Sequence, residues 1–275
     1  MHCIIRLSLT LCFVLVCVCG KGGFGASQPR THGVDGGEIP VRRLDGGVGL
    51  PTSERINGKD VFNIESFPYV VGLYQRLGGR EIYVCSGTVV HRNVVLSAAH
   101  CFLEFIPDSS YQVCYGIANL TKKNRICTPM VARKLQNSFN RDATTGPFDL
   151  ALIKTKDRID SPRTEIATVD FRLKSTKGKR AGFLLGFGPS ASEPSERLRY
   201  LKAVHSRMEL CVNHTNAKYF QCARSGKNSG LGGPCVGDSG GPLVEGPVHN
   251  PKHHRVLGVL SYTFIDSGGK LDLIL

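Results

Sequence analysis

The sequence predicts an all-β fold, and three observations support this prediction. From about residue 56 onward, short runs of β-branched and aromatic residues alternate with turn residues, which is the pattern of a β-sandwich or barrel. There is no internal repeat, and no long segment has the period of a helix. A short helix is expected only near residues 206–210. The expected strands lie at residues 69–73, 88–90, 93–97, 150–153, 183–186 and 256–260.

The length and composition indicate a globular protein with flanking segments. The chain has 275 residues, of which 41% are hydrophobic and 21% charged, which fits one domain of about 200–250 residues or two smaller ones and excludes a disordered acidic tail. The formal net charge is +13, but the basic residues are scattered. The densest basic run, at residues 174–180, has no aromatic platform or DNA-reading motif beside it. We therefore expect a solvated basic surface and no nucleic-acid partner.

The first 20 residues are typical of a signal peptide. Arg6 precedes an almost entirely apolar run over residues 7–19, and Gly20 ends it. The run is too short to span a bilayer, so a cleaved signal is favoured over an uncleaved anchor. Residues 21–55 are rich in glycine and polar residues and contain no cysteine, which indicates a flexible propeptide. The mature protein is expected to be secreted, with no membrane association.

The cysteine count agrees with secretion. Four of the 11 cysteines lie within residues 1–20, and seven lie beyond them. Cysteines of a secreted domain form disulfides. Because seven is odd, at least one thiol is unpaired or pairs with another chain.

A glycine-rich serine loop stands at residues 237–243, with the sequence Gly-Asp-Ser-Gly-Gly-Pro-Leu. Serine is a poor nucleophile unless a base takes its proton and donors stabilise the oxyanion. Glycines on both sides of Ser239 let the backbone turn tightly and leave its hydroxyl open. The N–H groups of Gly237 and Ser239 would then face one oxyanion hole. A glycine-rich turn around a serine is by itself more often simply a turn, but the full seven-residue string is much more specific.

Two further motifs supply a candidate base and a candidate acid. His100 follows an apolar run and adjoins Cys101, which would fix the backbone that carries the imidazole. Asp149 opens a strongly apolar run, so its carboxylate must be hydrogen-bonded if it is buried. Taken singly, the histidine is more often a surface or core residue, and the aspartate a strand-end turn residue. The chain order His, Asp, Ser differs from that of α/β-hydrolases and subtilisins.

Together these motifs resemble the trypsin/chymotrypsin type of serine peptidase, and the resemblance covers residues 55–263. It implies two packed six-stranded antiparallel β-barrels with a catalytic triad in the cleft between them. Ser239 would attack the scissile carbonyl, His100 would take its proton and pass it to the leaving amine, and Asp149 would orient His100. No metal or organic cofactor is implied.

The resemblance also implies a zymogen. Arg55-Ile56-Asn57-Gly58 is similar to the family's activation site, where an activating protease cuts after the basic residue. The new ammonium group of Ile56 would pair with Asp238 and order the oxyanion loop. Asn57 departs from the family's usual valine.

Three disulfides are expected. The resemblance implies one in the histidine loop and one in the second barrel, and proximity in the sequence predicts a third, local bridge. Cys235 stands where the family has a cysteine bridged to a later strand, but no later cysteine is present, so Cys235 is the expected unpaired thiol. The expected bridges are Cys85–Cys101, Cys211–Cys222 and Cys114–Cys127.

The end of the chain departs from the family. Ser261 to Thr263 match the segment that pairs with the substrate backbone, but few residues follow. We expect the second barrel to lack its last strand and the C-terminal helix, with residues 271–273 as the stub of that strand. The peptidase domain, residues 56–275, is thus expected to be truncated at its C-terminus.

The specificity pocket is expected to be apolar. Its base should be Gly233, where trypsin-like enzymes have an aspartate, so no carboxylate would offset the desolvation of a Lys or Arg side chain. Thr263 replaces a glycine of the pocket wall and should narrow it. Small or medium apolar side chains are the expected substrates, and trypsin-like specificity is rejected.

Two weaker features of the sequence are glycosylation sequons and a cluster of histidines. Asn119 and Asn213 begin glycosylation sequons. His249, His253 and His254 cluster near a loop, but adjacent histidines are usually solvated and no acidic or thiol ligand is close, so no metal site is expected.

The sequence as a whole predicts a secreted, monomeric serine endopeptidase. It would act on proteins or peptides through an acyl-enzyme, and proteinase inhibitors are further expected partners. The main alternative is a non-catalytic homologue that binds a partner protein through the same surface. A basic protein that binds acidic polysaccharide is a third hypothesis, which depends on charge alone.

Overall fold

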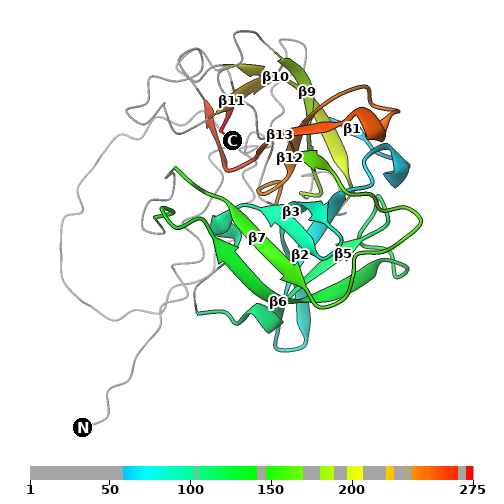
Figure 1. Ribbon diagram of the computed structural model, residues 1–275, viewed down its shortest axis with the longest axis vertical. Coiled ribbons are helices and arrows are strands. Elements are labelled where there is room, and N and C mark those ends of the chain that lie inside the picture. Colours follow the sequence, from blue (N-terminus) through cyan, green and yellow to red (C-terminus); the bar gives the residue numbers. More distant parts are fainter. Residues whose placement is uncertain are drawn as a thin grey trace, which may run out of the picture. The chain divides into compact units, whose positions relative to one another are not determined.

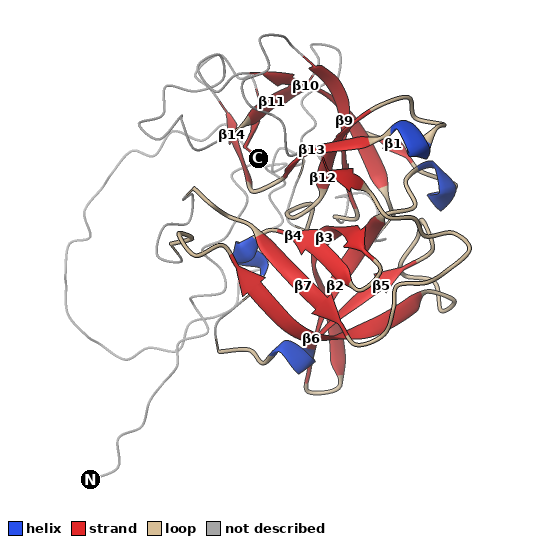
Figure 2. Ribbon diagram, in the orientation of Figure 1, coloured by secondary structure: helices blue, strands red, loops and turns tan. Residues whose placement is uncertain are grey.

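A computed structural model describes residues 58–102, 105–140, 147–169, 180–188, 197–206, 221–225, 234, 237–265 and 271–274 (Figure 1). In this part of the chain strands dominate, and the helices are short 3₁₀ turns (Figure 2). Each of the six runs expected to be strands lies mainly in one. The all-β prediction is therefore confirmed. The short helix expected at residues 206–210 falls mostly outside the described residues.

The first body of the fold is a closed β-barrel. Buried and exposed side chains alternate along one of its strands, as expected where one face of a strand fills the barrel. In this strand, β7, the residues Ala151, Ile153 and Thr155 are buried, whereas Leu152 and Lys154 are exposed. Closure leaves no unpaired strand edge. Its six described strands, in the order β2-β3-β4-β7-β6-β5, are β2 (Val70–Leu77), β3 (Arg80–His91), β4 (Val94–Ser97), β7 (Ala151–Thr155), β6 (Ile126–Leu135) and β5 (Tyr111–Tyr115).

The second body is a curved sheet. Its described strands follow the order β14-β15-β11-β10-β9-β12-β13-β8, and β1 (Lys59–Asp60) also pairs with β10. Only two residues separate β13 from β14 in the chain, although they lie near opposite ends of this order. The sheet must therefore curl round on itself, as a second barrel does. The other bounds are β8 (Thr168–Val169), β9 (Arg180–Gly186), β10 (Arg199–Ser206), β11 (Cys222–Ser225), β12 (Pro242–Glu245), β13 (Arg255–Val259), β14 (Tyr262–Ile265) and β15 (Leu271–Ile274).

The double-barrel prediction is thus confirmed, with one correction at its last strand. The segment expected to be only a stub, at residues 271–273, is the strand β15. It pairs antiparallel with β14 on one side, where Tyr262 faces Ile274, and with β11 on the other, where Cys222 faces the same residue. Although β15 has only four residues, it can pair with both of its neighbours because β11 and β14 are also four residues long.

Two of the expected disulfides are confirmed. Cys85 in β3 is bonded to Cys101, and Cys114 in β5 is bonded to Cys127, directly opposite in β6. Cys222 is also disulfide-bonded. Its expected partner, Cys211, lies outside the described residues, so that pairing stays a prediction.

An aromatic cluster joins the two bodies. Phe67, which precedes β2, contacts Phe183 of β9 and Tyr200 of β10, with ring centroids 6.3 and 5.8 Å apart. It also stacks on the imidazole of His254 at 5.2 Å. Contacts between aromatic rings contribute about 0.5–1.5 kcal/mol each beyond simple burial. This cluster therefore stabilises the junction between the two bodies.

His254 is buried in this junction, and only 3% of its surface is exposed. The expectation that the clustered histidines are solvated is wrong for this one. Its Nε2 lies 2.8 Å from the carbonyl oxygen of Pro247 and its Nδ1 lies 2.6 Å from the hydroxyl of Tyr69. Because a carbonyl only accepts, Nε2 carries the proton and Nδ1 accepts from the tyrosine. Burial lowers the pKa of His254 and keeps the ring neutral.

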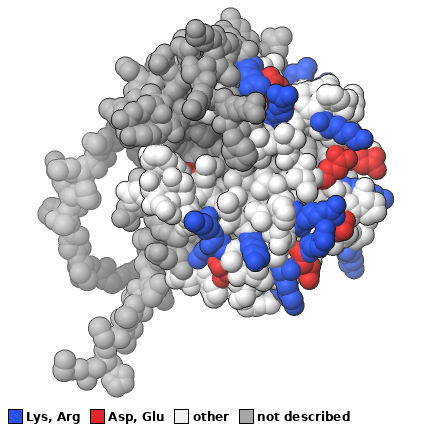
Figure 3. All heavy atoms as spheres, in the orientation of Figure 1, with Lys and Arg blue, Asp and Glu red and all other residues white. Residues whose placement is uncertain are grey.

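Basic and acidic side chains are interspersed over the face shown in Figure 3. Several basic residues of the described chain are paired locally, which offsets part of the positive charge. These pairs are partly buried, with the arginine side chains 12–20% exposed. The pairs include Arg125–Glu81, Arg133–Asp108, Arg180–Glu245 and Arg199–Asp60.

We expect the free energy of unfolding to fall as the pH is lowered from 7 to 5. The pKa of His254 is lowered in the folded state, so below about pH 6.5 the unfolded chain binds more protons than the folded one. His205, whose pKa is also lowered by burial, contributes with the same sign. Urea unfolding at a series of pH values measures the slope. His254→Gln should make it shallower, whereas His249→Gln, at an exposed position, should leave it unchanged. Equal slopes in all three proteins would contradict the assignment to His254.

Candidate active site

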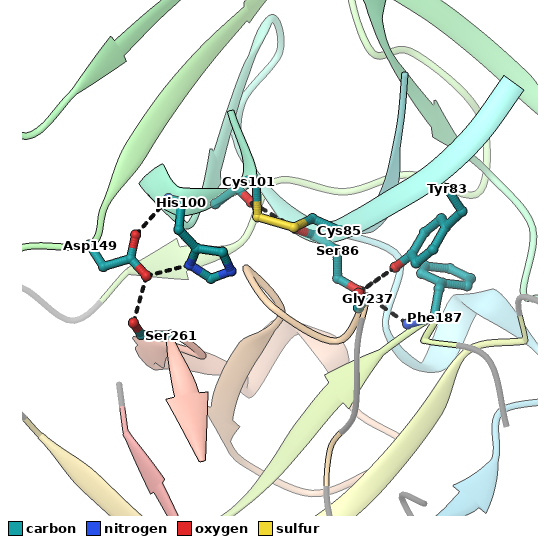
Figure 4. The surroundings of a disulfide bond; sticks show 10 residues. Tyr83, Cys85, Ser86, His100, Cys101, Asp149, Phe187, Gly237 and Ser261 are labelled. Carbon is teal, nitrogen blue, oxygen red and sulfur yellow. Dashed lines mark hydrogen bonds and ion pairs between the residues drawn. A yellow bond between two sulfur atoms is a disulfide. The ribbon is translucent and has the colours of Figure 1, made fainter. Parts of the chain in front are cut away.

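His100 lies on a short 3₁₀ turn that follows β4 directly. The turn spans Ala99–Cys101 (η3), and the disulfide from Cys101 to Cys85 ties it to β3. The imidazole lies between the disulfide and Asp149 (Figure 4). Its side chain is 29% exposed. The turn and the disulfide thus hold the ring in place and leave one edge open to solvent.

Asp149 is buried just before β7 and accepts three hydrogen bonds. Its Oδ1 accepts from the backbone N–H of His100 at 2.8 Å, and its Oδ2 accepts from Nδ1 of the same residue at 2.6 Å. The hydroxyl of Ser261 donates to Oδ2 at 2.5 Å. Because Nδ1 donates its proton to the carboxylate, Nε2 of the neutral ring is the basic nitrogen.

The pKa of Asp149 reflects opposing effects. Burial raises this pKa. The hydrogen bond and positive charge of His100 and the hydrogen bond from Ser261 lower it, and together they outweigh the effect of burial. The net pKa lies below the usual value. The carboxylate is therefore ionised at neutral pH, and it can stabilise a positive charge on His100.

The residue before Asp149 has a strained backbone. Phe148 has a φ of 68°. Among the described residues other than glycine, it alone has a positive φ. Its carbonyl accepts from the N–H of Leu150 at 2.8 Å, which makes a tight turn centred on Asp149. A bulky side chain in the left-handed region costs on the order of 1–3 kcal/mol. The strain turns the carboxylate back toward His100.

The loop that carries Ser239 packs against β3 and β4, the two strands next to the histidine turn. The carbonyl of Ser239 accepts from the N–H of Ser86 in β3 at 2.8 Å. Gly240 has a φ of +79°, and a Cβ there would lie 2.1 Å from Oγ of Ser97. Only glycine permits so close an approach. The serine is thereby held beside the histidine turn, which begins at Ala99, two residues after Ser97.

Asp238 is buried in a pocket made by two glycines. Its exposed fraction is 2%, and its Oδ1 accepts from the N–H of Gly188 at 2.9 Å. A Cβ on Gly186 would lie 2.1 Å from Oδ1, and one on Gly188 would lie 2.7 Å from it. The expected pairing with Ile56 stays a prediction, because that residue lies outside the described chain.

The structure describes only some of the other residues that the sequence predicts for the site. Ser261 is buried and Thr263 is partly exposed on β14. Asn119 is partly buried, and its side-chain oxygen accepts from the N–H and the hydroxyl of Thr121. The residues outside the described chain are Arg55, Ile56, Cys211, Asn213, Gly233 and Cys235.

The structure adds contacts that the sequence did not reveal. The hydroxyl of Ser261 holds Asp149, a contact that adds to the expected role of this segment in substrate binding, which stays a prediction. Tyr83 and Ser86 both hydrogen-bond to the carbonyl of Gly237. Their position beside Cys85 is the one sequence signal that could have drawn attention to them.

In the described residues, one cluster has its possible metal-ligand atoms close together: Cys85, His100 and Cys101. The chemistry of these residues does not support a metal site there. Both sulfur atoms belong to a disulfide, so neither is a thiolate ligand. The imidazole is held by Asp149. Separately, none of the described helices is both long and apolar enough to span a membrane.

Two β-barrels, a histidine on a disulfide-tied turn and a buried aspartate define the chymotrypsin-like class of proteins. The family named Trypsin matches residues 56–272, and the chain belongs to this family of serine proteases. Among curated proteins, the chain is 28% identical to trypsin delta of Drosophila melanogaster over 243 residues, which cover 83% of this chain and 84% of that protein. It is 29% identical to alpha-fibrinogenase of Macrovipera lebetinus over 203 residues, covering 71% and 74% respectively.

The strain at Phe148 predicts an unusual order of stability. Phe148→Gly should be more stable than Phe148→Ala by about 1 kcal/mol, because both variants lose the ring but only glycine relieves the left-handed backbone. Urea unfolding measures the difference. Leu150 is exposed and does not have a positive φ. As the control, Leu150→Ala should therefore be more stable than Leu150→Gly. The same order at both positions would show that Phe148 is not strained.

Proposed function

We propose that the protein is a secreted serine endopeptidase that hydrolyses peptide bonds through Ser239, His100 and Asp149. The observation that carries the proposal is the pair of hydrogen bonds from His100 to the buried carboxylate of Asp149, at 2.8 and 2.6 Å. This geometry orients Nε2 as the base that serine chemistry requires. Membership of the trypsin family supports the same reaction.

In the proposed acylation step, Nε2 of His100 takes the hydroxyl proton of Ser239 while Oγ attacks the carbonyl carbon of the substrate. The resulting oxyanion accepts hydrogen bonds from the N–H groups of Gly237 and Ser239. The imidazolium, stabilised by Asp149, then gives its proton to the leaving amine. The carbon–nitrogen bond breaks, and an ester to Oγ remains.

Deacylation reverses these proton transfers. A water molecule gives a proton to Nε2 of His100 and attacks the ester carbonyl. The second tetrahedral intermediate collapses, and Ser239 leaves with the proton from His100. Asp149 stays ionised throughout, which agrees with the direction of its pKa shift. The products are a carboxylic acid and the regenerated enzyme.

A non-catalytic homologue would not need this arrangement. A buried carboxylate is costly to keep unless its oxygens are paired. In this chain the donors come from His100 and Ser261 together. The retained network favours an enzyme over a protein that uses the fold only for binding.

We further propose that substrates with small or medium apolar side chains are preferred. Gly233 offers no carboxylate for a basic side chain, and Thr263 on β14 carries a side chain where the resemblance implies a glycine. The proposed mature protein is a glycosylated monomer. At Asn119, the hydrogen bonds to Thr121 orient the sequon.

Replacing Ser239 by alanine should abolish amidase activity, with a loss on the order of 10⁴-fold or more, because no nucleophile remains. Peptide hydrolysis and labelling by a fluorophosphonate probe measure this directly. The thermal melt should stay within about 2 °C of the wild type, since Ser239 is only partly buried and the change removes a single hydroxyl. Substantial turnover in the purified variant would show that another group is the nucleophile.

Activation should require cleavage between Arg55 and Ile56. After treatment with trypsin, N-terminal sequencing of the active form should read Ile-Asn-Gly. Arg55→Gln should stay inactive because it removes the basic residue that trypsin needs, whereas Arg55→Lys should be activated normally. Full activity of Arg55→Gln after the same treatment would contradict the proposed activation.

A further inference from the structure

The carbonyl of Gly237 is bound by two hydroxyl groups from the first barrel. The hydroxyl of Tyr83 donates to it at 2.7 Å, and the hydroxyl of Ser86 lies 3.1 Å from it. The two hydroxyls are 2.8 Å apart. Both belong to β3, on either side of Cys85 (Figure 4). Because the two hydroxyls also lie within hydrogen-bond distance of each other, their two protons serve three contacts, and at least one proton faces the carbonyl oxygen of Gly237.

Ser86 holds the serine loop at two points. Its backbone N–H donates to the carbonyl of Ser239 at 2.8 Å, while its hydroxyl bonds the carbonyl of Gly237. The same hydroxyl accepts from the N–H of Phe187, next to β9, at 3.0 Å. A single side chain thus connects both barrels to the loop between residues 237 and 239.

The ring of Tyr83 closes the space around Gly237. A Cβ on this glycine would lie 2.6 Å from Cε1 of Tyr83. The ring is held in turn by Tyr74, at a centroid distance of 5.4 Å in an edge-on arrangement. The hydroxyl is therefore presented to the carbonyl by a side chain that has little room to move.

The conformation of Gly237 needs such support. Its φ is +93°, and a glycine has access to both signs of φ at similar cost. Rotation about this residue would turn its N–H away from the position where the oxyanion forms. An oxyanion hole works only when its donors are oriented before the reaction.

We propose that Tyr83 and Ser86 are positioning residues that clamp the carbonyl of Gly237 and thereby hold the oxyanion loop in its catalytic conformation. The inference rests on the proposed function, but the clamp itself is a structural contact. It acts on the loop from the first barrel, while the pocket of Gly186 and Gly188 holds Asp238 on the second.

The first test measures the loop without using activity. Tyr83→Phe removes the hydroxyl and keeps the ring. Hydrogen exchange followed by mass spectrometry should be at least about tenfold faster in the peptide that contains residues 237–241, since a net hydrogen bond is worth roughly one factor of ten. Tyr111→Phe is the matched control, because it removes a tyrosine hydroxyl from the same barrel, where the partner is Gln75. Unchanged exchange at 237–241 would overturn the clamp, whether or not the protein is active.

The second test measures turnover after activation. Tyr83→Phe and Ser86→Ala should each lower kcat about tenfold and change KM less than about twofold, because the loop acts on the transition state rather than on substrate binding. Tyr111→Phe should have the wild-type kcat. Ser86→Thr, which keeps a hydroxyl, should recover most of the loss seen in Ser86→Ala. A wild-type kcat in Tyr83→Phe, or a loss matched by Tyr111→Phe, would refute the positioning role. A wild-type protein that shows neither turnover nor fluorophosphonate labelling would instead reject the proposed function.

Discussion

The buried carboxylate of Asp149 is the constraint on which the arrangement of the two bodies depends. A charge removed from water must have its oxygens paired, or it destabilises the fold by several kcal/mol. The donors are two groups of His100, in the first barrel, and the hydroxyl of Ser261, which precedes β14 of the second sheet. The two bodies must therefore meet at this point. The same pairing fixes the tautomer of the imidazole, so stability and chemistry share one interaction.

Close backbone packing is the second constraint, and glycine residues satisfy it. The serine loop passes between the two bodies, where Gly240 lies against Ser97 and Gly241 lies against the carbonyl of Leu185. A side chain at either position would collide with atoms of the surrounding strands. The loop can therefore pass between the two bodies only because these positions have no Cβ. On its far side, Asp238 fills the space left by Gly186 and Gly188.

Three histidines show how the surroundings decide the role of one residue type. His100 is partly exposed and paired with a carboxylate. His254 is buried between Tyr69 and a carbonyl group, and burial lowers its pKa. His205 is buried on β10, bonded to Gln221, and its pKa is also lowered by burial. His100 keeps one edge open to solvent, whereas the other two act as neutral parts of the core.

The sequence by itself determined the features that depend on near neighbours. These include the six expected strands and the local bridge between Cys114 and Cys127, and the family resemblance extended them to the double barrel. Only the tertiary structure decided which distant groups meet. Ser261 reaches Asp149 across 112 residues, and Tyr83 reaches Gly237 across 154. The pairing of β15 on both sides and the burial of His254 were decided in the same way. Strand propensity and turn chemistry act over a few residues, but these contacts depend on how closed sheets pack, which no short segment of the chain encodes.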